Sequence, residues 1–264
     1  MELKVDYHIH TNYSDGVMTP TQIIKKFKDE EYDVIAITDH DGIDGLNEAK
    51  IAGEAIELKV ILGIELSAVT DDERSLHILG YNIDINNSEL REAMMMLKKW
   101  REDRNIELLK LLNSKGYDID LEEIYNKKGN KYIGKPDIAR VLYEKGQIKS
   151  IEEAFDDEKG IFSSAEATGI KKRKLRSNEA INLIKRANGT PVLAHPMKIK
   201  GLGEKGSKEF FDNLDKLVKE LKKQGLRGIE CFHPSATFED SNKVVMIAEK
   251  YHLHITEGSD FHGE

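Results

Sequence analysis

The sequence predicts an α/β fold in which seven strands alternate with helices, as in a (β/α) barrel, and a mainly helical insertion interrupts them. Two observations favour this fold. Short apolar runs recur between amphipathic segments at both ends of the 264-residue chain, but not in its middle. Histidines and carboxylates follow most of these runs. A barrel brings such strand ends onto one face even when they are distant in sequence.

The first half of the chain supplies four of the seven strands. Short runs of apolar residues predict strands at Leu3–Ile9, Val34–Thr38, Val60–Leu66 and Leu76–Ile83. A helix is expected after Thr19, because threonine caps a helix N-terminus and Pro20 fits the first helical position. The Ala- and Glu-rich segment Leu46–Leu58 predicts the next helix.

The middle of the chain is expected to be helical. One long helix is predicted from Ser88 to about Ser114, and shorter helices at Leu121–Asn126, Asp137–Lys145 and Ile151–Phe155. Glycines between these segments indicate turns. We therefore expect a helical, substrate-covering insertion domain at residues 88–176, and a barrel formed by residues 1–87 and 177–264.

The last third of the chain returns to the alternation. Helices are expected at Asn178–Ala187, Ser207–Gln224 and Glu239–Tyr251, and they precede strands at Thr190–Ala194, Gly228–Phe232 and His254–Glu257. Because helices separate the strands, we expect a parallel sheet.

The composition favours a cytoplasmic protein. The single cysteine, Cys231, excludes an internal disulfide framework. The N-terminus has no signal-peptide pattern, and no apolar stretch approaches the roughly 20 residues of a membrane span. No membrane association is expected, and no obligate protein partner is evident. The net charge is −8, but residues 87–176 are locally basic, with 20 Lys and Arg against 17 Asp and Glu. Such basic segments bind phosphates or form solvated faces.

The candidate functional residues are histidines and carboxylates. His8 and His10 stand two apart in an expected strand, so both side chains point to one side and reach one ion. Asp260 and His262 repeat this spacing. The other candidates near strand ends are Asp15, Asp39, His40, Glu65, His77 and His195. So many nitrogen and oxygen ligands predict several metal ions in one site and favour hydrolysis.

These candidates belong to motifs that span nearly the whole chain. The motifs are Asp6-Tyr7-His8-Ile9-His10-Thr11, Ser14-Asp15-Gly16, Thr38-Asp39-His40-Asp41, Gly63-Ile64-Glu65, Ala194-His195-Pro196 and Gly258-Ser259-Asp260-Phe261-His262-Gly263. In order and spacing they resemble the PHP (polymerase and histidinol phosphatase) family, and most of all its TrpH/YciV-like group of phosphoesterases. The resemblance implies a distorted seven-stranded barrel with a helical insertion.

The resemblance also implies a centre of two or three divalent ions, Mn, Zn or Fe. One ion would be held by His8, His10, Glu65 and Asp260, a second by Glu65, His77 and His195, and a third by Asp15, His40 and His262. The reacting water would be activated by these ions and held through His8, His10, Asp15, His40, Glu65 and Asp260. Asp6 and Asp39 would orient the ligands or cap strand ends, and Glu230 would support the site.

Residues that bind the substrate phosphate are expected mainly in the insertion. They are Arg101, Arg104, Lys135 and Arg140, together with His233 of the barrel. The TrpH/YciV-like group has Gly-Arg-Pro-His where this chain has Gly134-Lys135-Pro136-Asp137. Lys135 keeps the charge but loses the guanidinium fork. Asp137 replaces a phosphate donor with an anion.

The leading function is hydrolysis of phosphate esters of nucleotides or RNA, as by a 3′,5′-nucleoside bisphosphate phosphatase or a 5′-3′ exoribonuclease. Histidinol phosphatase, or another small-molecule phosphatase, is the first alternative. An amidohydrolase-type metalloenzyme also begins with two histidines on a barrel strand, but leaves Glu65 without a role. A nucleic-acid-binding protein with a metal site and no turnover is the third alternative. Structural zinc sites are usually thiolate-rich, which one cysteine does not fit.

Overall fold

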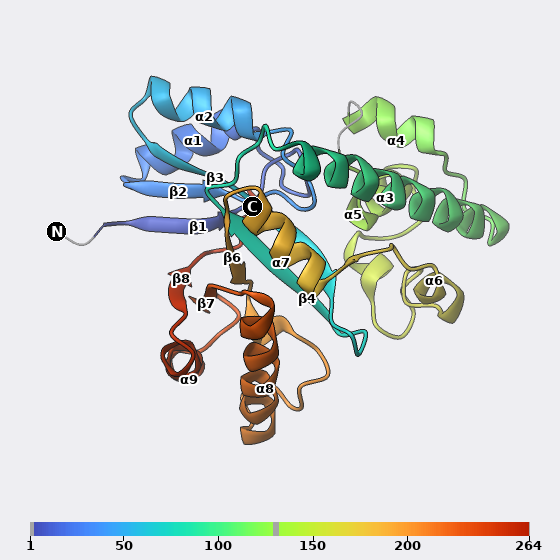
Figure 1. Ribbon diagram of the computed structural model, residues 1–264. Coiled ribbons are helices and arrows are strands. Elements are labelled where there is room, and N and C mark those ends of the chain that lie inside the picture. The colour runs from blue at the N-terminus through green and yellow to red at the C-terminus, as the bar shows by residue number, and fades with distance from the viewer. Residues whose placement is uncertain (1–2, 129–131, 264) are drawn as a thin grey trace. The chain divides into compact units, whose positions relative to one another are not determined.

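The computed structural model of the protein describes residues 3–128 and 132–263 (Figure 1). The chain forms two compact units. The barrel unit comprises Met1–Met94 and Lys174–Glu264, and the insertion unit comprises Met95–Arg173.

The barrel unit is built on one sheet with the strand order β1-β2-β3-β4-β6-β7-β8. These strands are β1 (Val5–Ile9), β2 (Val34–Ile37), β3 (Lys59–Val69), β4 (Ser75–Tyr81), β6 (Thr190–Leu193), β7 (Gly228–Phe232) and β8 (His254–Glu257). The short strand β5 (Leu175–Arg176), which was not predicted, pairs with β3 outside this order. Beyond β8, Phe261 forms a bridge with Ile9, and its carbonyl accepts a 2.9 Å hydrogen bond from the His10 N–H. The sheet is therefore nearly closed, and the predicted α/β barrel is confirmed.

The prediction of a parallel sheet is wrong for one strand. β4 runs antiparallel to both of its neighbours, β3 and β6. A short turn connects β3 to β4, and within it the Thr70 N–H donates to the Arg74 carbonyl at 2.9 Å. Parallel strands need a crossover of a dozen or more residues, whereas a short turn joins only antiparallel strands. As a result His77 lies near the start of β4, and Glu65 lies inside β3 and not at a strand end.

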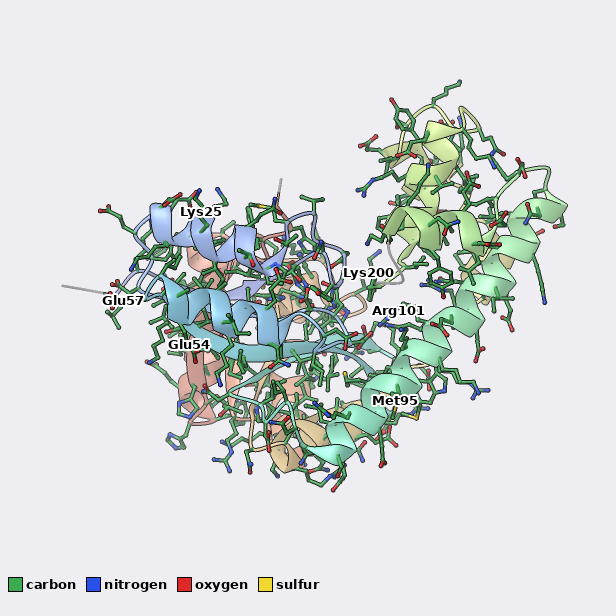
Figure 2. All side chains as sticks on the ribbon, turned by 90° about the horizontal axis from the view of Figure 1, so that it is seen from above. Lys25, Glu54, Glu57, Met95, Arg101 and Lys200 are labelled. Atoms are coloured by element: carbon green, nitrogen blue, oxygen red, sulfur yellow. The ribbon has the colours of Figure 1, made fainter. Side chains whose placement is uncertain are left out.

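The helices of the barrel unit lie outside the sheet. They are α1 (Pro20–Asp29), α2 (Leu46–Ala55), α7 (Ser177–Arg186), α8 (Lys208–Gln224) and α9 (Phe238–Lys250). Thr19 caps α1 as predicted, since its hydroxyl accepts from the Gln22 N–H at 3.2 Å. α1 packs on α2, α2 contacts β3, and α9 contacts β7 and β8. The charged side chains Lys25, Glu54 and Glu57 project outward from this layer (Figure 2).

The apolar core determines which way the site residues point. Ile9, Ile64 and Leu66 are fully buried. Side chains alternate between the two faces of a strand. Burying Ile9 on one face therefore directs His8 to the other, and burying Ile64 and Leu66 does the same for Glu65.

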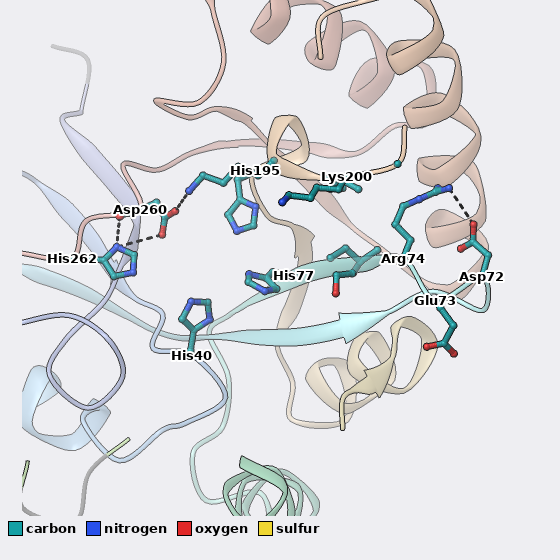
Figure 3. Close-up of a pocket in the computed structure, with 14 residues that line it drawn as sticks. His40, Asp72, Glu73, Arg74, His77, His195, Lys200, Asp260 and His262 are labelled. Carbon is teal, nitrogen blue, oxygen red and sulfur yellow. Dashed lines mark hydrogen bonds and ion pairs between the residues drawn. The ribbon is translucent and has the colours of Figure 1, made fainter. Parts of the chain in front are cut away.

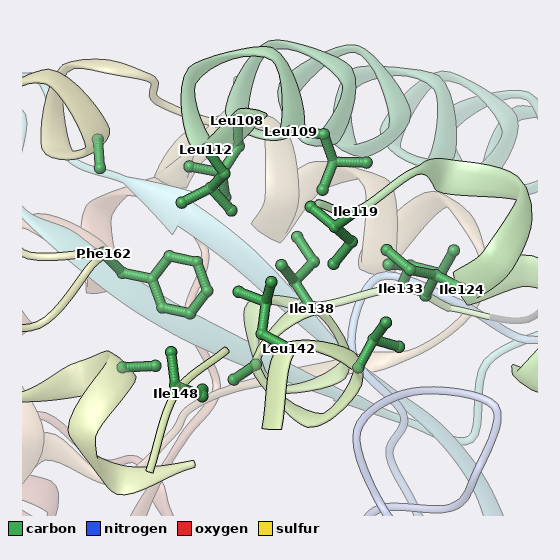
Figure 4. Close-up of a cluster of buried hydrophobic side chains, with 14 residues drawn as sticks. Leu108, Leu109, Leu112, Ile119, Ile124, Ile133, Ile138, Leu142, Ile148 and Phe162 are labelled. Atoms are coloured by element: carbon green, nitrogen blue, oxygen red, sulfur yellow. The ribbon is translucent and has the colours of Figure 1, made fainter. Parts of the chain in front are cut away.

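The insertion unit has helices and a core of its own. It contains α3 (Ser88–Ser114) from Met95 onward, α4 (Leu121–Lys128), α5 (Lys135–Glu144), the 3₁₀ turn η1 (Glu152–Phe155) and α6 (Ala165–Gly169). Leu108, Leu112, Ile138, Leu142 and Phe162 pack together in its core (Figure 4). No strand occurs among the described residues of this unit, whereas β5 lies at the end of the range 88–176 that was expected to be helical.

Two details of the insertion differ from the expectation. The helix expected at Ile151–Phe155 is the 3₁₀ turn η1, and the short helix α6 was not predicted. Both are too short to show a helical hydrophobic period. Among the helices that the structure describes, none combines the length and the apolar character that a membrane crossing requires.

Candidate metal centre

Glu65 is the middle of the site, and one of its carboxylate oxygens contacts three histidines. Oε1 lies 2.9 Å from Nδ1 of His77, 2.9 Å from Nε2 of His195 and 3.5 Å from Nε2 of His8. These ligands come from β4, the end of β6 and β1. The antiparallel course of β4 brings its first half to the face where the parallel strands end, which is how His77 reaches Glu65.

The second oxygen of Glu65 faces two more histidines. Oε2 lies 2.8 Å from Nδ1 of His40 and 3.4 Å from Nε2 of His10. His40 follows β2 and forms an isolated bridge with Glu65. On either side of this bridge, Glu65 N–H donates to the Asp39 carbonyl at 3.1 Å, and Asp41 N–H donates to the Glu65 carbonyl at 2.9 Å. Backbone pairing thus holds His40 beside Glu65.

Asp260 joins the cluster from the segment after β8. Its Oδ1 lies 3.1 Å from Nε2 of His10 and 3.5 Å from Nε2 of His8. Its Oδ2 turns the other way, 2.5 Å from Nζ of Lys198 and 3.4 Å from Nε2 of His233. One oxygen of Asp260 therefore faces the ligand histidines, and the other is held by a cation.

Asp15 organises a further group. Its Oδ1 lies 3.3 Å from Nε2 of His262 and 3.6 Å from Nδ1 of His10, and its Oδ2 lies 3.6 Å from Nε2 of His40. The structure thus brings together all nine residues predicted as ligands: His8, His10, Asp15, His40, Glu65, His77, His195, Asp260 and His262.

The buried polar atoms of this cluster fit divalent cations. Six of them have no hydrogen-bond partner: Nε2 of His8 and of His10, Nδ1 of His40 and of His195, Oε2 of Glu65 and Oδ1 of Asp15. The 2.8 Å contact between His40 and Glu65 is close, but it lacks hydrogen-bond geometry. Buried polar atoms are rarely left without a partner. Converging imidazole nitrogens and carboxylate oxygens are a donor set that first-row divalent metals accept.

The ligand atoms fall into three groups whose members lie within 4.8 Å of one another. The groups are His10, Asp15, His40 and His262; His8, His10 and Glu65; and His40, Glu65 and His77. They overlap with the ligand sets implied by the resemblance without matching them in full. His10 joins the Asp15 group, and His40 takes the place of His195 beside His77.

The electrostatics keep the carboxylates of the cluster ionised. Burial favours the neutral form of Glu65, but His40, His77 and His8 outweigh it and hold its pKa well below the usual range. Burial likewise opposes the charge of His40, yet Glu65 and Asp15 raise its pKa to about 9. At His77 burial prevails over Glu65 and lowers the pKa to about 4. Burial also lowers the pKa of His10. The cluster therefore offers negative charge and two readily neutral imidazoles, His10 and His77, to a cation.

The three residues predicted to support the ligands do so in different ways. Glu230 contacts a ligand ring: its Oε1 lies 2.9 Å from Nδ1 of His8, and its Oε2 accepts from the His195 N–H at 2.6 Å. Asp6 holds backbone instead, since its Oδ1 accepts from the N–H groups of His8 at 3.1 Å and Ser259 at 3.0 Å. Asp6 thereby ties β1 to the segment that carries Asp260.

Asp39 supports the loop that follows β1. Its Oδ1 accepts from the Thr11 N–H at 2.7 Å and from the Ser14 hydroxyl at 2.5 Å. The Ser14 oxygen lies 3.4 Å from Nδ1 of His10. Asp39 thus acts on His10 through Ser14, without contacting the imidazole.

Three of the predicted phosphate-binding residues lie together in the insertion unit. Burial, and then the neighbouring Arg101, lower the pKa of Arg104; burial, and then Arg104, lower the pKa of Lys135. The Arg101 guanidinium lies 3.8 Å from the centre of the Tyr132 ring. Arg140 is exposed on α5. His233 lies in the barrel unit, beside Asp260.

Asp137 has a structural role in this conformation. Its carboxylate accepts from the Gly134 N–H at 2.8 Å at the start of α5, and it lies 2.9 Å from Nζ of Lys128. A carboxylate near a helix N-terminus also interacts favourably with the positive end of the helix dipole. Asp137, which replaces the histidine of the related motif, therefore caps α5.

The sequence reasoning missed Lys198 and Lys200. Both line a pocket of about 800 Å³ in the barrel unit, together with His40, His77, His195, Asp260 and His262 (Figure 3). The available signal was the alternation of lysines in Pro196-Met197-Lys198-Ile199-Lys200, directly after a predicted ligand.

Comparison with known proteins identifies the family. The family model of the PHP domain matches residues 6–190. The chain belongs to the PHP domain family. The resemblance carried by the sequence motifs is therefore confirmed.

Relatives of this PHP protein match it over nearly its full length. A 5′-3′ exoribonuclease from Haemophilus influenzae is 27% identical over 99% of this chain and 91% of its own. A phosphoribosyl 1,2-cyclic phosphate 1,2-diphosphodiesterase from Eggerthella lenta is 27% identical over 98% and 94%. A 3′,5′-nucleoside bisphosphate phosphatase from Chromobacterium violaceum is 26% identical over 98% and 87%.

A solved structure shares the fold. A Bifidobacterium adolescentis protein, assigned as a metal-dependent phosphoesterase, superposes with a TM-score of 0.84 at 28% identity, and the match covers 100% of this chain and 89% of that one. Together with the cluster around Glu65, these comparisons confirm the predicted class of enzyme: a metal-dependent hydrolase of phosphate esters.

Proposed function

We propose that this PHP protein hydrolyses a phosphate ester of a nucleotide or of RNA at a centre of two or three divalent ions, Mn, Zn or Fe. The observation that carries the proposal is the convergence of five histidines on the two oxygens of Glu65, with buried lone pairs that no protein donor satisfies. The nucleotide and RNA substrates named for the relatives support the substrate class.

The residues of the cluster would hold the ions in overlapping sets. Glu65 would be shared between sets, because each of its oxygens faces different imidazoles. Asp260 would contribute Oδ1, and Asp15 would complete the set with His40 and His262. When bound, such ions polarise a phosphoryl oxygen and lower the pKa of a water molecule toward neutrality. Asp6, Asp39 and Glu230 would keep the ligand-bearing segments in place.

The cations of the insertion unit would bind a phosphate of the substrate. Arg101, Arg104 and Lys135 are the proposed residues of this unit, with Arg140 as a further candidate. In the barrel unit, His233 is proposed as a phosphate-binding residue by itself. Partial burial of neighbouring cations favours their neutral forms, which is the direction of the pKa changes at Arg104 and Lys135. A bound phosphate would reverse that effect, because it places negative charge among them.

Release of phosphate from the monoesters, and of mononucleotides from RNA, tests this function. The protein is stripped of metal by chelation and exhaustive dialysis, and then reloaded with Mn²⁺ or Zn²⁺. The substrates are a nucleoside 3′,5′-bisphosphate, a short 5′-phosphorylated RNA and histidinol phosphate. We expect activity on one of the first two, dependent on metal. His10→Ala should remove it, whereas His254→Ala, at an exposed histidine of β8, should not.

Three outcomes would contradict the proposal. Full activity after exhaustive chelation would exclude a metal centre. Turnover of histidinol phosphate alone would assign a small-molecule phosphatase. A gel shift with RNA, without turnover of any substrate, would assign a binding protein.

A further inference from the structure

The pocket beside the histidine cluster has a charged wall that the proposed metal centre does not use. Three cations line it, Arg74, Lys198 and Lys200, and all of them belong to the barrel unit. Figure 3 shows Lys200 between His195 and Arg74 on the wall of this pocket. The wall therefore differs from the cationic group of the insertion unit.

The acidic side chains of the same wall are already paired. Asp72 lies 3.1 Å from Nη2 of Arg74, and Glu73 lies 2.6 Å from Nη1 of Arg176. Asp260 pairs with Lys198 at 2.5 Å. Lys200 is the lining cation that forms no ion pair within the described part of the chain.

The segment that carries the two lysines is anchored at both ends. At its start, the His195 N–H donates to Glu230. Near its end, Leu202 is fully buried and its carbonyl accepts from Nδ2 of Asn213, on α8, at 3.0 Å. Between them Ile199 is extended, with φ −71° and ψ 118°, and is 6% exposed. An extended residue places its two neighbours on the same side. Lys198 and Lys200 therefore face the pocket together.

Lys198 also determines which oxygen of Asp260 faces the cluster. Its Nζ holds Oδ2, so Oδ1 is the oxygen that faces His8 and His10. A cation in this place lies at the edge of the metal centre, and Lys200 lies one step further along the same wall.

We propose that Lys200, with Lys198 beside it, binds a second phosphate of the substrate, so that the barrel selects substrates that carry a phosphate besides the one cleaved. Lysine suits this role as a point charge with several donors. The ammonium groups are exposed, so the interaction is weakened by salt. The inference rests on the proposed function for the reaction itself, but phosphate binding by Lys200 does not require turnover.

Charge reversal at Lys200 tests the inference in the Mn²⁺-loaded protein. The substrates are a nucleoside 3′,5′-bisphosphate, which carries a second phosphate, and p-nitrophenyl phosphate, which does not. For Lys200→Glu we expect the ratio of kcat/KM for the bisphosphate to kcat/KM for the monoester to fall about tenfold, mainly through KM. Lys200→Arg should restore most of the ratio. Lys205→Glu, at an exposed lysine of the same loop outside the pocket, is the matched control and should leave the ratio unchanged.

A 5′-phosphorylated dinucleotide distinguishes the sources of the second phosphate. If Lys200→Glu lowers kcat/KM for the bisphosphate alone, the substrate is a mononucleotide. If it also lowers kcat/KM for the dinucleotide, the second phosphate belongs to an RNA backbone. An unchanged ratio in Lys200→Glu, or an equal change in Lys205→Glu, would overturn the inference.

Equilibrium binding separates this inference from the proposed function. Isothermal titration of the metal-free protein with the bisphosphate should show about tenfold weaker binding in Lys200→Glu than in the unmodified protein. If the unmodified protein turns over no phosphate ester, the proposed function fails, and this titration still decides the role of Lys200. Equal affinities would count against it.

Discussion

Glu230 and His8 form a fully buried pair in which Oε1 of the carboxylate lies 2.9 Å from Nδ1 of the imidazole. A carboxylate only accepts hydrogen bonds, so Nδ1 carries the proton in this contact. Nε2 is then the nitrogen that faces Glu65, 3.5 Å away. The other oxygen of Glu230 accepts from the His195 backbone. One residue of β7 thus orients a ligand ring of β1 and fixes the backbone of another ligand.

Replacing Glu230 with glutamine should weaken metal binding without unfolding the protein. The amide presents a donor where the His195 N–H now finds an acceptor, so one buried contact is lost. Residues that orient metal-bound histidines typically contribute 10- to 100-fold in affinity, and we expect a loss of about that size. Titration of the chelated variant with Mn²⁺ measures it. Glu249→Gln, at an exposed position of α9, is the control. Equal metal affinity in the two variants would show that Glu230 is not needed.

Gly258→Ala should disturb the same contact by steric means. A Cβ at this position would lie 2.4 Å from the Cβ of His8 and 2.5 Å from Oε1 of Glu230. The His8 and Glu230 side chains must then move apart, at a cost of about 1–3 kcal/mol in the free energy of unfolding. Urea unfolding checks the stability, and a Mn²⁺ titration checks the site. Gly169→Ala is the control, because its Cβ meets nothing within 4 Å. Equal stability of the two variants would show that Gly258 is not required for this contact.

The metal-free protein should become less stable as the pH rises from 6.5 to 9. Against the effect of burial, Glu230 and Glu65 raise the pKa of His8, and Glu65 and Asp15 raise that of His40 to about 9. A raised pKa stabilises the folded state fully below the unfolded value of about 6.5, and this contribution is lost as the pH rises through the folded value. His77, with a pKa of about 4, stays neutral over this range.

Urea unfolding of the chelated protein at several pH values measures this slope. His40→Asn should reduce it, since one of the responsible groups is gone. Over the same range metal affinity should rise, because protons leave the ligands. Constant or rising stability of the chelated protein between pH 6.5 and 9 would contradict the assignment.

Arg104→Ala should weaken phosphate binding without lowering stability. The Arg104 Nε is buried without a hydrogen-bond partner, and the pKa of Arg104 is lowered by burial and by Arg101. Removing this charge relieves an unfavourable burial but deletes a phosphate donor. Binding of a nucleoside bisphosphate and urea unfolding report the two effects. Lys110→Ala, at an exposed position of the same helix, is the control. A large loss of stability would instead make Arg104 a structural residue.

The direction of β4 is the main feature of the sheet that the sequence analysis predicted wrongly. The sequence predicts its apolar run and His77, but the expectation of a parallel strand is wrong. The connection between Leu66 and Leu76 is too short for a helical crossover, and this length was the signal for an antiparallel pair. Two residues form β5, and five form α6, which is too few for a periodic pattern. Lys198 and Lys200 alternate directly after His195, but this pattern is weak without their neighbours in space, Asp260 and the pocket wall.

The alternation of strands and helices, the break at the insertion and the nine candidate ligands are predictable from the sequence, because they depend on local periodicity and on residue chemistry. Three relations become visible only in the folded chain. Glu65 lies between His77, His195 and His40, Asp6 and Asp39 bind backbone and hydroxyl groups, and Lys198 binds one oxygen of Asp260. The physical reason is that these relations join segments far apart in the chain. The direction of β4 and the near-closure at Ile9 and Phe261 set them. The short connection before β4 indicates the first, but no local pattern encodes the second.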